Sequence, residues 1–140
     1  MRCSAPSRIE GKRVAITGAG GGLGRAMAIQ FVKQGWKVAI ADINATAMQE
    51  SFDAVIERSK DSFIQHCNVC QEANFEKLLA KCNERCGGVD VLVNKAGIAS
   101  FNGIHKESIN SWQRMLDINT LGAVRCGAVR CTGAKCLRLR

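Results

Sequence analysis

The chain of 140 residues has the size of one folded domain, and its 20 Lys and Arg against 12 Asp and Glu give a formal net charge of +8. Five basic residues lie in the acid-free stretch 125–140, so the rest is nearly neutral and gives no sign of nucleic-acid binding. No stretch approaches the ~18 uncharged apolar residues of a membrane span. Eight cysteines without an apolar leader predict reduced thiols in the cytoplasm.

The first predicted strand, 12–17 ("KRVAIT"), runs through the glycine-rich stretch "TGAGGGLG" at 17–24 into a predicted helix at 23–34. A helix that begins in this way has several unpaired N–H groups pointing at one spot, where its dipole favours negative charge. The stretch therefore predicts a cradle for a pyrophosphate. Gly18 would permit the sharp turn, Gly22 would clear the phosphate's path, and Gly24 would let the helix lie close to the strand.

The rest of the chain repeats the alternation of strand and helix. Further strands are predicted at 36–43, 62–69 and 89–94, and further helices at 45–59, 75–86 and 109–124. Such alternation implies right-handed crossovers and a parallel sheet. We expect an α/β, Rossmann-like, doubly wound domain over 8–124, cut short after about four strands in the order 3-2-1-4, with its ligand at the carboxyl edge.

Asp42 ends the second predicted strand, 24 residues after Gly18. A carboxylate at this place accepts hydrogen bonds from a ribose 2′-hydroxyl and repels a 2′-phosphate. The sequence therefore favours NAD over NADP as the cofactor. Asp42 or Asn44 could also cap the helix that follows, and the two roles are compatible.

Two stretches leave alternatives open. "GAVRC" at 122–126 recurs at 127–131, and a five-residue period fits neither a helix nor a strand, so 125–140 is predicted to be an irregular basic tail, or else an arm for acidic partners. The pairs Cys67/Cys70 and Cys82/Cys86, beside His66, resemble two halves of a zinc site. Buried thiols explain these cysteines better, so we expect no metal.

Four stations together resemble the short-chain dehydrogenase/reductase family over residues 8–124. "TGAGGGLG" is similar to the family's TGxxxGxG, "CNV" at 67–69 to its Asp-Val pair, and "NKAG" at 94–97 to its NNAG. Asn119 in "LDINTLG" is similar to the helical Asn of the family's catalytic tetrad. Asn68 and Lys95 depart from the family pattern, where an Asp and an Asn stand.

The resemblance implies a nicotinamide dinucleotide as ligand. The cofactor-binding residues that it implies are Thr17, Gly18, Gly20, Gly22, Leu23, Gly24, Asp42, Asn68, Val69, Asn94, Ala96 and Gly97. Of the family's catalytic residues, only Asn119 has a counterpart in this chain. The sequence contains no tyrosine. In the family, a Tyr four residues before a Lys, together with a Ser, completes the tetrad for hydride transfer between alcohol and ketone.

We therefore expect an NAD(H)-binding oxidoreductase of this type, present as a truncated chain that is inactive alone. The alternative is a non-catalytic dinucleotide-binding or dimerisation module, pairing with a second copy or a full-length relative. Its surfaces would be the exposed edge of the last strand, at 91–93, and the apolar face of the last helix, with Trp112, Met115 and Leu116.

Overall fold

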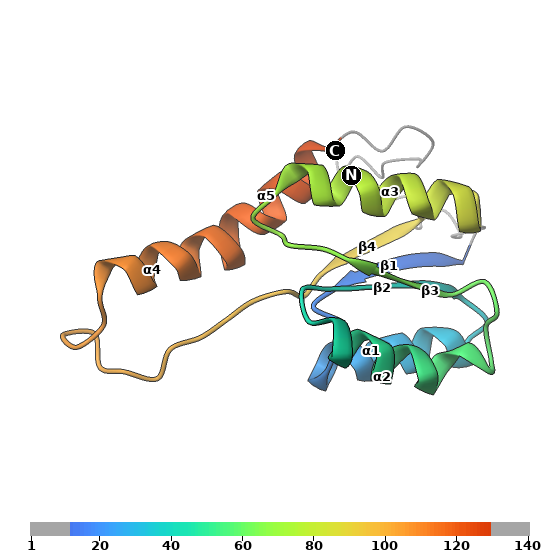
Figure 1. Cartoon of the computed structure of the whole chain (residues 1–140), viewed down its shortest axis with the longest axis horizontal. Coiled ribbons are helices and arrows are strands. Elements are labelled where there is room, and N and C mark those ends of the chain that lie inside the picture. The colour runs from blue at the N-terminus through green and yellow to red at the C-terminus, as the bar shows by residue number, and fades with distance from the viewer. Residues whose placement is uncertain (1–11, 130–140) are drawn as a thin grey trace, which may run out of the picture.

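The computed structural model describes residues 12–129, which form an α/β unit around one sheet (Figure 1). Its elements in chain order are β1 (Arg13–Thr17), α1 (Gly22–Lys33), β2 (Lys37–Asp42), α2 (Ala45–Ile56), β3 (Phe63–His66), α3 (Glu72–Cys86), β4 (Val91–Asn94), α4 (Ile109–Leu116), the π-helical turn η1 (Asp117–Leu121) and α5 (Gly122–Ala128). Each predicted strand and helix is present, with ends that differ by a few residues.

The four strands are parallel and lie in the order β3-β2-β1-β4, which confirms the predicted topology. Ile16 in the central strand β1 lies opposite Ile40 of β2 and Val93 of β4. Within residues 12–129, β3 and β4 are the two edges of this sheet. The strand order reverses at β1, so the carboxyl ends of β1 and β4 meet beside the glycine turn.

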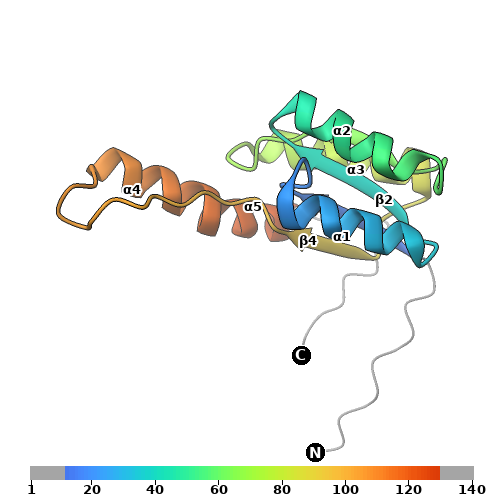
Figure 2. The same ribbon diagram turned by 90° about the horizontal axis from the view of Figure 1, so that it is seen from below.

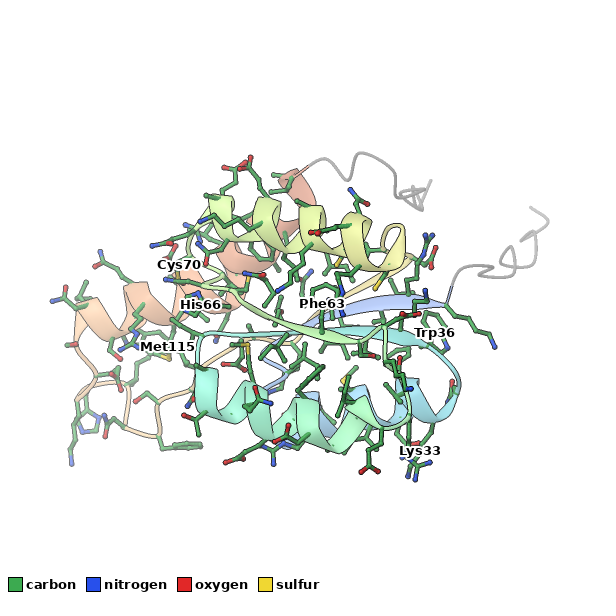
Figure 3. All side chains as sticks on the ribbon, turned by 45° about the vertical axis from the view of Figure 1, so that its right-hand side comes forward. Lys33, Trp36, Phe63, His66, Cys70 and Met115 are labelled. Atoms are coloured by element: carbon green, nitrogen blue, oxygen red, sulfur yellow. The ribbon has the colours of Figure 1, made fainter. Side chains whose placement is uncertain are left out.

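Helices cover both faces of the sheet, with α1 and α2 on one side and α3 and α5 on the other (Figure 1). Alternate residues of β1 supply the two cores, because successive side chains of a strand point to opposite faces. Val14 and Ile16 are buried beneath α1 and α2, and Ala15 is buried beneath α3. Figure 3 shows the ring of Phe63 between the sheet and α3.

The last helical segment projects away from the sheet (Figure 2). None of the residues of α4 is buried, whereas Gly122 and Cys126 of α5 are. The turn η1 lies between them. One nearly continuous helix thus has an exposed first half and a second half that packs against α3 and the end of β4.

The structure differs from the predicted tail boundary, because regular helix continues through Ala128 rather than stopping at 124. A helix needs only one face to be apolar, and Gly122 and Cys126, four residues apart, provide it. Arg125 also bonds back to Asp117, with Nη2 2.6 Å from Oδ1. The first "GAVRC" therefore belongs to the folded unit, and the last two residues of the second, 130 and 131, lie outside the described residues.

None of the helices in the described part of the chain is long and apolar enough to cross a lipid bilayer.

Candidate functional site

The glycine turn has a backbone that a larger residue would not allow. Gly18 has a φ of +66°, and a Cβ on it would lie 2.8 Å from Cα of Ala96. A Cβ on Gly24 would overlap the carbonyl oxygen of Gly18 and lie 2.8 Å from Cα of Ala19. The turn therefore packs tightly against the loop after β4, and α1 begins directly against the turn.

Asp42, at the end of β2, is hydrogen-bonded to this turn. Its Oδ2 accepts a hydrogen bond from the Gly20 amide at 2.9 Å, and its Oδ1 accepts one from the Asn44 amide at 3.0 Å. Asn44 in turn caps α2, because its Oδ1 accepts from the Ala47 amide at 3.0 Å. Of the two residues that the sequence offered as the cap of this helix, Asn44 is the one that caps it, and Asp42 contacts the glycine turn.

A second set of contacts holds the same turn from the side of α2. The carbonyl oxygen of Gly20 accepts hydrogen bonds from Nη2 of Arg25 and from Oγ of the buried Ser51, both at 2.9 Å. Arg25 also bonds Ser51 Oγ through Nε at 2.9 Å. Both backbone polar groups of Gly20, its N–H and its C=O, are therefore hydrogen-bonded, which holds the peptide groups on either side of it.

Thr17 ties the end of β1 to the end of β4. Its side chain is almost fully buried, and its Oγ1 donates to the Val93 carbonyl at 3.3 Å. The same Oγ1 accepts from the amides of Lys95 and Ala96, at 3.2 and 3.3 Å. The "NKAG" segment begins at this connection, so one hydroxyl sets the course of its backbone beside the glycine turn.

Asn68 and Val69 follow β3 on the same edge of the sheet. Oδ1 of Asn68 accepts from the Cys70 amide at 3.0 Å, and the Asn68 amide donates to Oδ1 of Asn74 at 3.1 Å. The Asn68 side chain therefore stabilises its own turn. Val69 is buried, and a Cβ on Gly122 would lie 3.0 Å from its Cγ2, so α5 packs closely on this turn.

Asn119 lies in the π-helical turn and is exposed. Its side chain makes a double connection to the loop after β4: Oδ1 accepts from the Ile98 amide and Nδ2 donates to the Ile98 carbonyl, both at 2.8 Å. This residue therefore positions the backbone that follows "NKAG". Such π turns are frequent at functional sites.

These elements surround a cleft of about 360 Å³ at the carboxyl edge of the sheet. It is lined by Gly18, Gly21, Asp42, Ile43, Cys67, Asn68, Val69, Lys95, Ala96, Gly97, Ile98, Arg114 and Ile118. Six predicted site residues are among them, namely Gly18, Asp42, Asn68, Val69, Ala96 and Gly97. The structure thus brings three separate sequence stations to one cleft.

The other predicted site residues do not line this cleft. Thr17, Gly20 and Asn119 support its walls through the hydrogen bonds described above. Gly24 lies in the first turn of α1, and Gly22, with a φ of +52°, begins that helix. Leu23 is 66% exposed beside a separate depression on α1, and Asn94 ends β4 opposite Thr17 and is exposed.

Sequence reasoning missed several residues that line the cleft. Ile43 and Cys67 are direct neighbours of predicted residues, so the strand ends could have indicated them. Arg114 and Ile118 are four residues apart on the last helix, which places them on one face. Nothing in the sequence shows that this face leans toward the cleft, because the direction of α4 depends on the loop 95–108.

The charges around the cleft favour an anion. Lys95 and Arg114 line it with positive charge, and Asp42 is the only carboxylate among the lining residues. The first turn of α1 has no acidic residue and no side-chain cap, so no side chain of that turn offsets the positive end of the helix dipole. Burial, with a contribution from Asp42, raises the pKa of the Cys67 thiol to about 11, so Cys67 adds no charge at neutral pH.

The zinc alternative finds no support in residues 12–129, where no three His, Cys, Asp or Glu side chains gather in a way that could hold a metal ion. Cys82 is buried in the core on α3, and Cys67 is buried beside the cleft. Figure 3 shows His66 and Cys70 near each other at the end of β3 and the turn after it. Burial also raises the pKa values of the Cys70 and Cys86 thiols.

A family model for short chain dehydrogenase matches residues 12–131. An uncharacterised oxidoreductase of Thermotoga maritima is 36% identical over 118 residues, which are 84% of this chain and 46% of that protein. The chain thus spans about half the length of the curated relatives it matches. The matched region includes the glycine turn, the cleft and the whole of α5.

Solved structures of this family resemble the fold of this chain. A short chain dehydrogenase/reductase of Burkholderia phymatum, in complex with NAD, superposes with a TM-score of 0.83 at 26% identity, over 91% of this chain and 46% of that one. A 3-ketoacyl-(acyl-carrier-protein) reductase of Brucella melitensis, complexed with NADH, superposes with a TM-score of 0.78 at 28% identity, over 86% and 48% of the two chains.

Proposed function

Because the chain belongs to the short-chain dehydrogenase/reductase family, we propose that its cleft binds NAD(H) and that the chain is the dinucleotide-binding part of an oxidoreductase acting on an alcohol or ketone. The observation that carries this proposal is the meeting of the glycine turn, Asp42 and the "NKAG" loop around one positively charged cleft. Relatives of the same fold have NAD or NADH bound. We place the protein in the cytoplasm.

The lining residues suggest how a dinucleotide would lie. Asn68 and Val69 stand at the end of the cleft where the adenine would bind, and Asp42 stands next to them for its ribose. The amides of the glycine turn would receive the paired phosphates. Ala96 and Gly97 would face the nicotinamide ribose. When bound, the nicotinamide supplies the hydride chemistry, and the residues described here bind and orient it.

We propose a preference for NAD over NADP because of Asp42. Each oxygen of its carboxylate accepts one backbone hydrogen bond and keeps a lone pair for a ribose hydroxyl. A 2′-phosphate would meet the same carboxylate as a like charge. The lining residues next to Asp42, namely Ile43, Cys67 and Asn68, are uncharged, so none of them would offset this repulsion.

Calorimetric titration of the purified chain with NAD⁺ and NADP⁺ tests both proposals. We expect NAD⁺ to bind more tightly, and we expect the ratio of the two affinities to fall at least severalfold in Asp42→Asn, which retains one acceptor for the Gly20 amide but no charge. Asp53→Asn, an exposed carboxylate on α2, is the matched control and should leave the ratio unchanged. Tighter binding of NADP⁺ by the natural chain would contradict the assignment.

We further propose that this polypeptide binds the dinucleotide without turnover by itself. The sequence contains no tyrosine, and Asn119 is the one residue that matches the family's tetrad. A missing general acid or base typically lowers a rate by about 10²- to 10⁴-fold. Incubation with NADH and a panel of ketones, followed by nicotinamide absorbance, should show no oxidation above the protein-free rate. Measurable turnover would overturn this part of the proposal.

The apolar face of α4 favours a second function, self-association. Ile109, Trp112 and Leu116 are 71%, 40% and 57% exposed and recur at helical spacing along the projecting helix (Figure 2). We propose that this face binds the same face of a second copy. Sedimentation should show a dimer for the natural chain and a monomer for Trp112→Ser. A monomer in both cases would contradict self-association, and a full-length relative would then be the alternative partner for this face.

A further inference from the structure

Lys95 is the charged residue of the cleft that departs from the family pattern, because the family's NNAG motif has an uncharged Asn there. The backbone of Lys95 is held by two hydrogen-bond acceptors. The Lys95 amide is within hydrogen-bond distance of both Thr17 Oγ1, at 3.2 Å, and the Val93 carbonyl, at 3.1 Å. The starting point of the side chain is therefore fixed by the end of β1 and the end of β4.

From this point the side chain of Lys95 lies along the glycine turn. A Cβ built on Gly18 would be 3.2 Å from Cδ of Lys95, which is two bonds from the ammonium nitrogen. Lys95 also lines the cleft together with Gly18 and Gly21, and it is half-buried. The positive charge therefore lies on the same side of the cleft as the turn whose amides begin α1.

The Lys95 ammonium forms no ion pair with the residues that the structure describes. The ion pairs of this part of the chain join other cations to Asp90, Glu50, Asp61 and Asp117. Asp42, the carboxylate of the cleft, is instead bonded to the amides of Gly20 and Asn44. A half-buried ammonium on the same cleft as the turn that leads into α1 attracts an anion, since a cation and a helix N-terminus both favour negative charge.

We propose that Lys95 forms an ion pair with the diphosphate of the bound dinucleotide, adding a side-chain cation to the backbone amides of the glycine turn. This inference rests on the proposed function, since it assumes that a dinucleotide occupies the cleft. It adds a specificity-determining residue that the motif itself does not contain. The bound ligand would have to carry a phosphate group close to Gly18, and ligands that lack one would gain nothing from Lys95.

The test is a calorimetric titration of the full chain with three probes: NAD⁺, ADP and adenosine. Lys95→Gln should bind NAD⁺ and ADP roughly tenfold more weakly, the size expected for a hydrogen bond to a charged group. Its affinity for adenosine should stay unchanged, because adenosine has no phosphate. Lys95→Arg retains the charge and should restore most of the affinity for ADP. Lys77→Gln, an exposed lysine on α3, is the matched control.

Ionic strength gives a second readout that the natural chain alone can provide. An ion pair at a half-exposed site is screened by salt, so ADP binding should weaken severalfold between about 0.05 and 0.5 M salt while adenosine binding changes little. This measurement keeps the inference testable if Lys95→Gln does not fold. Salt-independent binding of ADP would contradict the ion pair.

The outcomes separate this inference from the proposed function. If the natural chain ignores NAD⁺, ADP and adenosine alike, the proposed function fails and the inference fails with it. If the natural chain binds NAD⁺ and Lys95→Gln binds it equally well, only the inference fails. An equal loss of ADP and adenosine binding in Lys95→Gln would show a damaged cleft rather than a lost ion pair, and it too would overturn the inference.

Discussion

The amide of Gly20 donates to Oδ2 of Asp42 at 2.9 Å, so the carboxylate at the end of β2 holds the glycine turn. The same carboxylate bonds the Asn44 amide at the start of α2. Asp42 therefore joins two segments that both border the cleft. Its removal should affect stability as well as affinity, and the two effects need separate measurements.

We predict that Asp42→Ala lowers the free energy of unfolding by about 1–2 kcal/mol, because the partly buried amide of Gly20 and the exposed amide of Asn44 lose their acceptor. Asp42→Asn should cost less, since its remaining oxygen can serve one of them. Urea unfolding followed by circular dichroism measures both values. Equal stability of Asp42→Ala and the natural chain would mean that the Gly20 contact contributes nothing to folding.

Thr17 offers a sharper test of how the cleft is built. Thr17→Val keeps the shape of the side chain but removes the hydroxyl that contacts the Val93 carbonyl and the amides of Lys95 and Ala96. Because the Ala96 amide would lose this acceptor and the Lys95 amide would keep only the Val93 carbonyl, we expect a loss of about 1–3 kcal/mol of unfolding free energy. Thr17→Ser retains the hydroxyl, so urea titration should find it closer to the natural chain than Thr17→Val.

The Arg13–Asp90 pair predicts a dependence of stability on pH. Arg13 donates from its amide and from Nε to Oδ2 of Asp90 at 3.0 and 2.8 Å, and Nη2 lies 2.7 Å from Oδ1. Hydrogen bonding and the positive charge of Arg13 lower the pKa of the Asp90 carboxyl below its ordinary value. The stability that this pair contributes is therefore complete above the unfolded pKa and is lost as the pH falls through the folded one.

In measurable terms, Asp90→Asn should unfold with about 1–2 kcal/mol less free energy at pH 7, and the difference should shrink below a pH of about 4. Urea titrations of both chains at pH 7, 5 and 3 check this. A difference that stays constant down to pH 3 would show that the carboxyl charge is not what stabilises the contact.

The extent of α5 gives opposite predictions for two adjacent residues. Cys126→Asp places a charge in the buried cluster under α3 and should cost more than about 2 kcal/mol of unfolding free energy. Gly127→Ala should instead stabilise by roughly 0.5–1 kcal/mol, because nothing lies within 4 Å of its added Cβ and alanine favours helix. An irregular segment would show neither change. Thermal unfolding of the two variants distinguishes the two descriptions.

Much of the fold could be predicted because its cause is local. Alternating apolar runs gave β1 to β4 and the strand order, and the glycines at 18 and 24 stand where backbone approaches backbone too closely for a side chain. These constraints act on residues that are neighbours in sequence or are joined by short crossovers. The pattern of residue types therefore contains them.

The cleft was harder to predict because its lining depends on distant contacts. Arg114 and Ile118 reach it through the direction of the helix that follows the loop 95–108, and that direction depends on the contact between Asn119 and Ile98. The helix boundary at 124 was missed for a related reason. The burial of Cys126 depends on packing against α3 and on the turn that contains Val69, neither of which is visible in the repeat itself.

The π-helical turn η1 joins α4 and α5, whose apolar rows point in different directions. A π turn takes up one residue more than an α turn, and in an α-helix each residue rotates the chain by about 100°. The extra residue between 117 and 121 therefore sets the angle between the apolar row of α4 and the apolar row of α5. Deletion of Thr120 would rotate the apolar row of α4 by about 100° relative to Cys126, which packs against α3, so one residue in this turn sets the direction in which Trp112 points.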